Sequence, residues 1–173
     1  MYNYELKLVD SSRLIANIVV ADIGNDAKKF AEIMELALRG EYPLSMRAAR
    51  VIALSTEKNS DLIVPHLQSI IDTLDSIRVE GVKRSFLKIF AEMPVELNED
   101  MLGIITDRSF NWLVDPKEAV AIRYYAIDIL LKVTRLYPEI KVELADSLNS
   151  LLEDNSSALH AKSKKAINYL NKL

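Results

Sequence analysis

The side chains best suited to catalysis or metal binding are scattered along this sequence. Its two histidines, His66 and His160, are far apart, and neither has a second ligand three or four residues away. Metal sites on helices need that spacing because it brings two ligands to one helix face. The sequence therefore predicts no metal and no cofactor, and we expect both histidines to be ordinary surface or half-buried residues.

Other catalytic patterns are missing as well. Acidic pairs such as Glu99-Asp100 stand at predicted helix ends, where capping and the helix dipole account for them. The four glycines form no phosphate-binding loop, and no Gly-x-Ser-x-Gly nucleophile motif is present. Cysteine is absent, which excludes thiolate chemistry and disulfides. No residue is assigned a catalytic role, and the sequence favours a protein without enzymatic activity while leaving that question open.

Bulk composition narrows the class of protein further. A length of 173 residues predicts a single domain covering 1–173. The net charge of −3 argues against a protein held on nucleic acid by phosphate contacts. A net charge does not exclude a local basic patch. The first ten residues lack a basic start before an apolar run, and no apolar run is long enough to span a membrane. We therefore expect a cytoplasmic protein without a membrane partner.

Apolar residues recur three and four positions apart between regularly spaced breaks, which is the period of α-helices. Asn98 is predicted to cap one helix, and Asp115, Pro116 and Glu118 are predicted to start another as a capping box. Gly24 and the break at Gly40 follow apolar runs as helix C-terminal glycines do. The expected helices are 11–23, 26–39, 44–57, 61–76, 79–93, 99–114, 117–136, 139–153 and 157–172.

These helices are periodic. An apolar residue precedes a basic one near the start of every second helix, and the basic residues follow at intervals of 36, 40 and 39 positions. The pairs are Met46-Arg47, Val82-Lys83, Ile122-Arg123 and Ala161-Lys162. A large apolar residue stands seven positions after each basic residue: Leu54, Phe90, Leu130 and Tyr169. Arg13 fits an earlier, decayed copy.

Met46 to Leu54 resembles the second helix of a HEAT repeat, which opens with an apolar-Arg pair followed by alanines and a leucine. Leu62 to Asp72, with Pro65, is similar to the first helix. The resemblance to the HEAT-repeat and armadillo-like family implies an all-α fold, an α-α superhelix forming a short right-handed solenoid of about four hairpins. The repeats would cover approximately 26–57, 61–93, 99–136 and 139–172, with an N-terminal capping helix at 11–23.

The same resemblance implies a function. Second helices line the concave side of such solenoids, which is their usual binding surface. On two of them the residues left facing outward are Arg84 and Lys88, then Tyr124 and Asp128. Exposed tyrosine beside arginine is typical of a binding spot. We therefore expect an interaction scaffold or adaptor that binds a partner protein or peptide at these residues. The oligomeric state stays open.

A second function remains an alternative. Trp112, the only tryptophan, lies near Asp115 in the chain, and Arg123 follows on the next helix. Alkylpurine DNA glycosylases, which are HEAT-like proteins, hold a damaged nucleotide with a tryptophan, an aspartate and an arginine. The similarity implies a nucleic-acid site at Trp112, Asp115 and Arg123. A core tryptophan, a capping aspartate and a repeat-motif arginine explain the same residues. A regulatory or lyase-type subunit is supported by the fold alone.

Overall fold

The computed structural model describes residues 2–153 and 156–173, and all regular structure in these residues is helical. The predicted all-α fold class is confirmed, and helices pack on neighbouring helices as in an α-α solenoid. The helices form two compact units, Met1–Glu96 and Leu97–Leu173.

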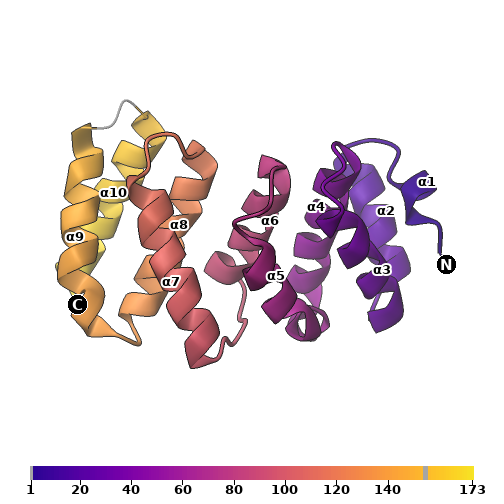
Figure 1. Ribbon diagram of the computed structural model, residues 1–173, viewed down its shortest axis with the longest axis horizontal. Coiled ribbons are helices and arrows are strands. Elements are labelled where there is room, and N and C mark those ends of the chain that lie inside the picture. The colour runs from indigo at the N-terminus through magenta and orange to yellow at the C-terminus, as the bar shows by residue number, and fades with distance from the viewer. Residues whose placement is uncertain (1, 154–155) are drawn as a thin grey trace. The chain divides into compact units, whose positions relative to one another are not determined.

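Unit 1 contains six α-helices (Figure 1). Their bounds are α1 Tyr4–Lys7, α2 Arg13–Ile23, α3 Ala27–Leu38, α4 Leu44–Lys58, α5 Leu67–Thr73 and α6 Glu80–Glu92. Two short 3-10 turns, Ser60–Leu62 and Val64–His66, precede α5. The helix predicted over 61–76 is therefore shorter than expected. Pro65 lies within the second turn, and proline both lacks an N–H group and disfavours α-helical backbone in the residue before it.

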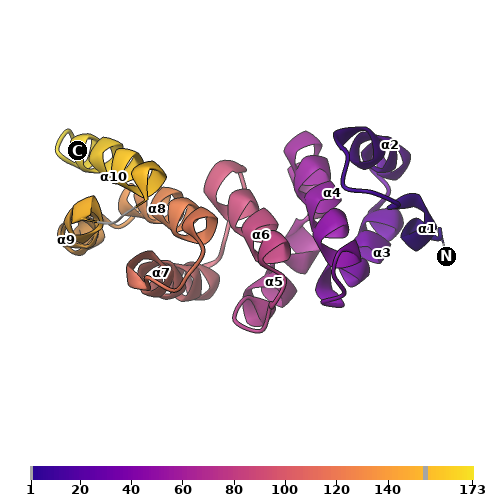
Figure 2. The same ribbon diagram turned by 90° about the horizontal axis from the view of Figure 1, so that it is seen from above.

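Unit 2 contains α7 Glu99–Val114, α8 Val120–Thr134, α9 Lys141–Ser150 and α10 Ser157–Leu170. The 3-10 turns Pro138–Ile140 and Leu151–Glu153 flank α9. Within each unit the helices form two layers (Figure 2). In the layer of second helices, α2 packs on α4 and α4 on α6, and α8 packs on α10. In the layer of first helices, α1 packs on α3 and α7 on α9.

Three predicted helix ends are confirmed. The Asn98 side chain accepts a hydrogen bond of 2.8 Å from the Met101 N–H and caps α7. Gly24 ends α2 with φ of 51°, and Gly40 follows α3 with φ of 77°. L-residues with side chains rarely adopt these positive φ values, which explains glycine at both positions.

The predicted start of α8 is wrong. Asp115 Oδ1 accepts a hydrogen bond of 2.9 Å from the Lys117 N–H, so it closes a turn at Pro116 instead of capping a helix. Glu118 Oε1 accepts from the adjacent Ala119 N–H at 3.1 Å, and the helix begins only at Val120. The sequence Asp115-Pro116 fits both a turn and a helix start, because in both the aspartate side chain accepts a hydrogen bond from a following backbone N–H. The sequence alone could not distinguish them.

Helix α1 was not predicted. Tyr4 and Leu8 are each only 2% exposed, and the four-residue spacing places both on one side of this single turn. The Tyr4 hydroxyl donates to Asp22 Oδ2 at 2.9 Å, beside ion pairs from Lys7 and Lys29. The hydrogen bonds from Lys7, Tyr4 and Lys29 lower the pKa of Asp22 to about 2. The N-terminal segment is therefore fixed to α2 and α3 by one buried ring and one carboxylate.

Polar contacts between consecutive hairpins span roughly one repeat of sequence. Arg47 donates to the carbonyls of Leu8 and Val9 at 2.8 and 2.9 Å, and Arg50 donates to the Ser11 carbonyl at 2.7 Å. Asn59 donates to Asn25 at 3.0 Å across a separation of 34 residues. Arg47 is the basic member of the first repeat pair, so here the repeated position holds the preceding hairpin in place.

The start of α6 lies unusually close to α4. A Cβ placed on Gly81 would stand 2.4 Å from Met46 Cγ, well inside the contact distance of two carbon atoms. Gly103 on α7 has nothing within 4 Å of the same position. An added Cβ at 81 would therefore have to displace the half-buried Met46 side chain, whereas at 103 it would meet no neighbouring atom.

Substituting Gly81→Ala should lower the free energy of unfolding by about 1–2 kcal/mol, because overpacking at Met46 outweighs the gain in helix propensity. The matched change Gly103→Ala should raise it by up to about 1 kcal/mol. Urea denaturation followed by circular dichroism measures both. In a Met46→Ala background the cost of Gly81→Ala should shrink, and an unchanged cost would exclude the Met46 contact as its cause.

Acid stability should depend on Asp22. Its folded pKa of about 2 lies below an unfolded value of about 3.9, so the ionised side chain contributes stability above pH ~5 that is lost as pH falls toward 2. Asp22→Asn should therefore be less stable at pH 7 and show a flatter fall in melting temperature between pH 5 and pH 2.5. Asp72→Asn is the control, because an amide oxygen can still accept the bond from Gln68 on the same helix. Parallel melting curves for wild type and Asp22→Asn over this range would contradict the assignment.

Candidate functional site

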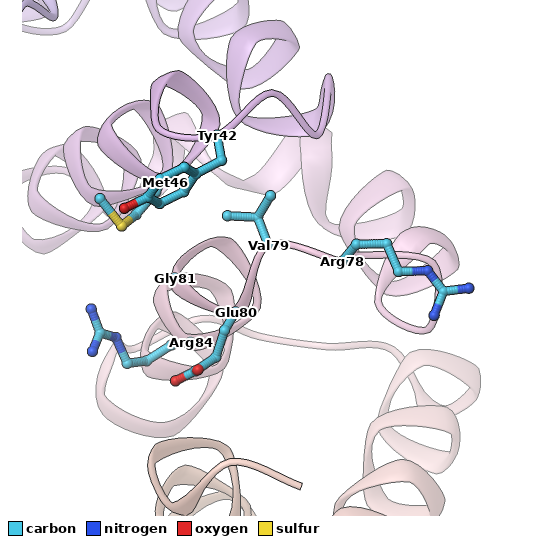
Figure 3. A pocket seen from close by; sticks show the side chains of 7 residues that line it. All are labelled: Tyr42, Met46, Arg78, Val79, Glu80, Gly81 and Arg84. Carbon is cyan, nitrogen blue, oxygen red and sulfur yellow. The ribbon is translucent and has the colours of Figure 1, made fainter.

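A pocket of about 420 Å³ opens between the starts of α4 and α6, in unit 1. One wall is formed by Tyr42 and Met46, and the other by Val79, Gly81 and the side chains around them (Figure 3). Arg84, one of the predicted binding residues, lines the pocket from the second turn of α6. Because α4 and α6 are second helices, the pocket lies in the layer where a binding site was expected.

Charged side chains stand on both sides of the pocket. Glu80 and Arg84 project from α6 on one side, whereas Arg78 points the other way from the segment before the helix (Figure 3). All three are exposed, and 73% of the Tyr42 side chain is accessible. An exposed tyrosine ring and exposed arginines at one pocket form a surface that suits recognition, since tyrosine and arginine dominate binding energy at interfaces.

Among the described residues, the two pocket arginines have no partner, unlike Arg39, Arg47 and Arg50 of the same unit. Arg39 forms an ion pair with Glu5, while Arg47 and Arg50 donate to backbone carbonyls. Among the described residues, no hydrogen bond or ion pair engages Arg78 or Arg84. Their guanidinium groups are therefore available to a ligand without breaking an internal contact.

Lys88 lies one helical turn beyond Arg84 on α6. Its ammonium group is 3.6 Å from Glu92 Oε2 on the same helix, and the side chain is 30% exposed. An exposed ion pair of this kind contributes little and exchanges readily. Lys88 and Glu92 thus form an ion pair with no net charge close to the pocket, and Lys88 is not one of the lining residues.

Tyr124 and Asp128 lie together in unit 2, around Lys162 of α10. The Lys162 ammonium group pairs with Asp128 and stands 4.2 Å from the centre of the Tyr124 ring. The side chains of Lys162 and Asp128 are only 16% and 26% exposed. The predicted pair of residues therefore takes part in a half-buried contact between α8 and α10, with the edge of Tyr124 still 36% accessible.

A second contact fixes the register of the same two helices. Arg135 Nε donates to the Tyr169 hydroxyl at 2.8 Å, and its guanidinium group lies over that ring. The Lys162–Asp128 and Arg135–Tyr169 contacts each join residues 34 apart in sequence. Arg135 lies seven residues, or about two helical turns, after Asp128, and Tyr169 lies seven residues after Lys162. Only parallel helices allow this equal spacing, so α8 and α10 run in the same direction, as second helices of consecutive repeats must.

The alternative residues Trp112, Asp115 and Arg123 surround the end of α7. Trp112 is 8% exposed and Arg123 is 4% exposed, while Asp115 lies at the surface in the turn. The Arg123 guanidinium donates through Nε to the Leu113 carbonyl at 3.1 Å, which satisfies a carbonyl at a helix C-terminus. These positions give each residue a structural role, and the nucleic-acid site stays a prediction.

In residues 2–153 and 156–173, the histidines and acidic side chains form no cluster of metal ligands. The His66 ring packs against Phe30, with ring centres 5.6 Å apart, and burial lowers the pKa of His66. Among the described residues no three His, Asp or Glu side chains gather as metal ligands would. A second pocket of about 450 Å³ lies between α1 and α3, where Glu5, Glu32 and Glu35 line it and Arg39 pairs with Glu5.

The family model of the HEAT repeat domain matches residues 4–169. The chain belongs to the HEAT-repeat family. No curated protein and no solved structure matches it. HEAT repeats form helical scaffolds that commonly mediate protein interactions. The matched range begins at Tyr4, so it includes α1 and extends the resemblance found from residue 26 onward to nearly the whole chain.

Within the described part of this HEAT domain, no helix is long and apolar enough to cross a membrane. The sequence proposed Arg84 as a binding residue, and it did not indicate Tyr42 and Arg78, which line the same pocket. Both precede second helices in irregular segments, where no periodicity indicates the direction of a side chain. An aromatic residue beside Pro43 in a predicted break was the one available signal for Tyr42.

The Lys162 contact can be tested by stability. Lys162→Met should lower the free energy of unfolding of unit 2 by about 1–2 kcal/mol, because a cation–π contact and a half-buried ion pair are both lost. Lys164→Met on the exposed side of α10 should change it by less than about 0.5 kcal/mol. Urea denaturation followed by Trp112 fluorescence reports on this unit. Equal stability of the two variants would rule out an energetic role for the contact.

Proposed function

We propose that this HEAT domain is an interaction scaffold that binds a partner protein or peptide through the face formed by its second helices. In repeat proteins that face forms the extended, concave binding surface. The observation that carries the proposal is the pocket of about 420 Å³ on which Tyr42 is exposed and Arg84 has no internal partner. Its size is suited to anchoring a side chain of a partner.

Stability alone does not account for the residues at this pocket. Tyr42 and Arg84 are exposed and bridge no helices by hydrogen bonds among the described residues, so the fold gains little from either. By contrast, Arg47, Arg123 and Lys162 all hold neighbouring segments together. Residues whose substitution does not lower folding stability are free to be used for recognition of a partner.

Affinity capture from native lysate tests the proposal, with a Tyr42→Ala, Arg84→Ala double variant beside the wild type. We expect wild-type protein to retain a stoichiometric protein partner that survives nuclease, and the double variant to lose at least about 90% of it, as truncated hot spots do. Arg13→Ala, which removes another exposed arginine without a partner in unit 1, should retain it. Circular dichroism should show all three proteins folded.

Two outcomes would contradict the proposal. Full retention of the partner by the double variant would exclude this pocket as the binding site. Recovery that disappears with nuclease would instead favour nucleic-acid binding and direct attention to Trp112, Asp115 and Arg123.

A further inference from the structure

The pocket between α4 and α6 combines a positive charge excess with an apolar wall. Arg78 and Arg84 contribute two positive charges and Glu80 one negative charge, which leaves the lining with an excess of one positive charge. Lys88, one turn beyond Arg84, is neutralised by its ion pair with Glu92. The complete chain carries a net charge of −3, so this positive spot stands against an acidic background. An acidic ligand is therefore attracted here and repelled by the average surface, which favours one binding position.

The guanidinium groups also set the chemistry of the anion. Arginine presents a planar set of donors that matches a carboxylate with two parallel hydrogen bonds. Because Arg84 has no partner among the described residues, a ligand carboxylate would not have to displace an internal acceptor. Arg78 stands on the far side of the pocket from Arg84 (Figure 3), so the two can hold separate carboxylates of one extended segment.

The apolar wall explains why the ligand must carry more than charge. The exposed Tyr42 ring, the half-buried Met46 side chain and Val79 line the space between the arginines. A tyrosine face and a thioether accept aliphatic or aromatic side chains with little geometric demand. One leucine-sized or phenylalanine-sized group fits a pocket of about 420 Å³, with flanking residues left at its charged edges.

A nucleic-acid backbone fits this surface less well than a peptide. Strong binding to nucleic acid needs many phosphate contacts from lysine and arginine. Here Arg78 and Arg84 are the two cationic side chains that line the pocket, which is too few for the many phosphate contacts of such binding. A peptide with separated carboxylates and one apolar side chain satisfies the arginines and the wall together.

We propose that the pocket formed by Tyr42, Met46, Val79 and Arg84 binds an acidic peptide segment of a partner protein, with one apolar side chain against Tyr42 and Met46 and a carboxylate on Arg84. This inference rests on the proposed scaffold function and defines the partner's chemistry at the same site.

A defined peptide set tests it by fluorescence anisotropy with the full chain. Nine-residue labelled peptides carry a central Leu, Phe or Ala, flanked by Asp and Glu, by Asn and Gln, or by Lys. We expect the acidic Leu or Phe peptides to bind at least about tenfold more tightly than their amide counterparts, since two charge-assisted pairs are lost in the amides. Exchange of the central residue for Ala should weaken binding by about tenfold.

Charge reversal locates the interaction. Arg84→Glu should abolish the preference for acidic peptides and favour the Lys-flanked set, whereas Arg13→Glu, at another exposed arginine without a partner, should keep the wild-type order. The inference would be overturned by equal affinity for acidic and amide peptides, or by loss of the preference in both variants. It would also be overturned if no peptide bound, or if a labelled DNA oligonucleotide bound more tightly than every peptide.

The two proposals can fail separately. If the Tyr42→Ala, Arg84→Ala variant loses a protein partner from lysate while the peptide set shows no acidic preference, the scaffold function stands and the acidic-peptide inference is wrong. If the partner is retained by that variant, the pocket is not the binding site and both proposals fail.

Discussion

Helix α4 is enclosed on nearly every side, and unit 1 depends on that enclosure. Six apolar residues between Ala48 and Leu54 are buried, and so are Ser45, Ser55 and Thr56. Helices α2, α3 and α6 supply the covering surfaces. A single hairpin of α3 and α4 could bury only the faces that its two helices share. The remaining apolar surface has to be covered by the hairpins before and after it, which is why such repeats are stable only as a stack.

Because the hairpins are stable only as a stack, the repeated basic residues have a structural role in holding neighbouring segments together. The hydrophobic effect has no direction, whereas a charged side chain that reaches a fixed acceptor adds a directional contact to the stack. Arg47 holds the carbonyls of Leu8 and Val9, and Lys162 holds Asp128 over the same kind of sequence separation. Arg123 performs the task within its own hairpin, on the Leu113 carbonyl. Three of the four periodic basic residues, Arg47, Arg123 and Lys162, therefore hold neighbouring segments together, and the acceptors that they use differ from repeat to repeat.

The helices were predictable where apolar period and capping chemistry agreed. Helix α7 begins and ends where expected, since Asn98 caps its first turn and the apolar pattern stops at Val114. Helix α8 began later than expected, because Asp115 was equally able to close a turn. Helix α1 is a single turn, too short to show a period, and only Tyr4 and Leu8 indicated a buried face. Of the site, Arg84 followed from helix periodicity, whereas Tyr42 and Arg78 lie in irregular backbone whose direction is set by tertiary contacts.

The close approach at Gly81 connects the fold to the pocket. Because position 81 has no Cβ, Met46 packs directly on the first turn of α6, and the segment carrying Tyr42 comes to lie opposite Val79. The wall of the pocket is thus fixed by a packing constraint of the core layer. The charged edge of the pocket is not fixed by packing. Arg78, Glu80 and Arg84 are exposed, and none of their side chains forms a hydrogen bond or ion pair among the described residues. Substitutions at these three positions would therefore change the charge at the edge of the pocket, while the contact that shapes the pocket stays the same.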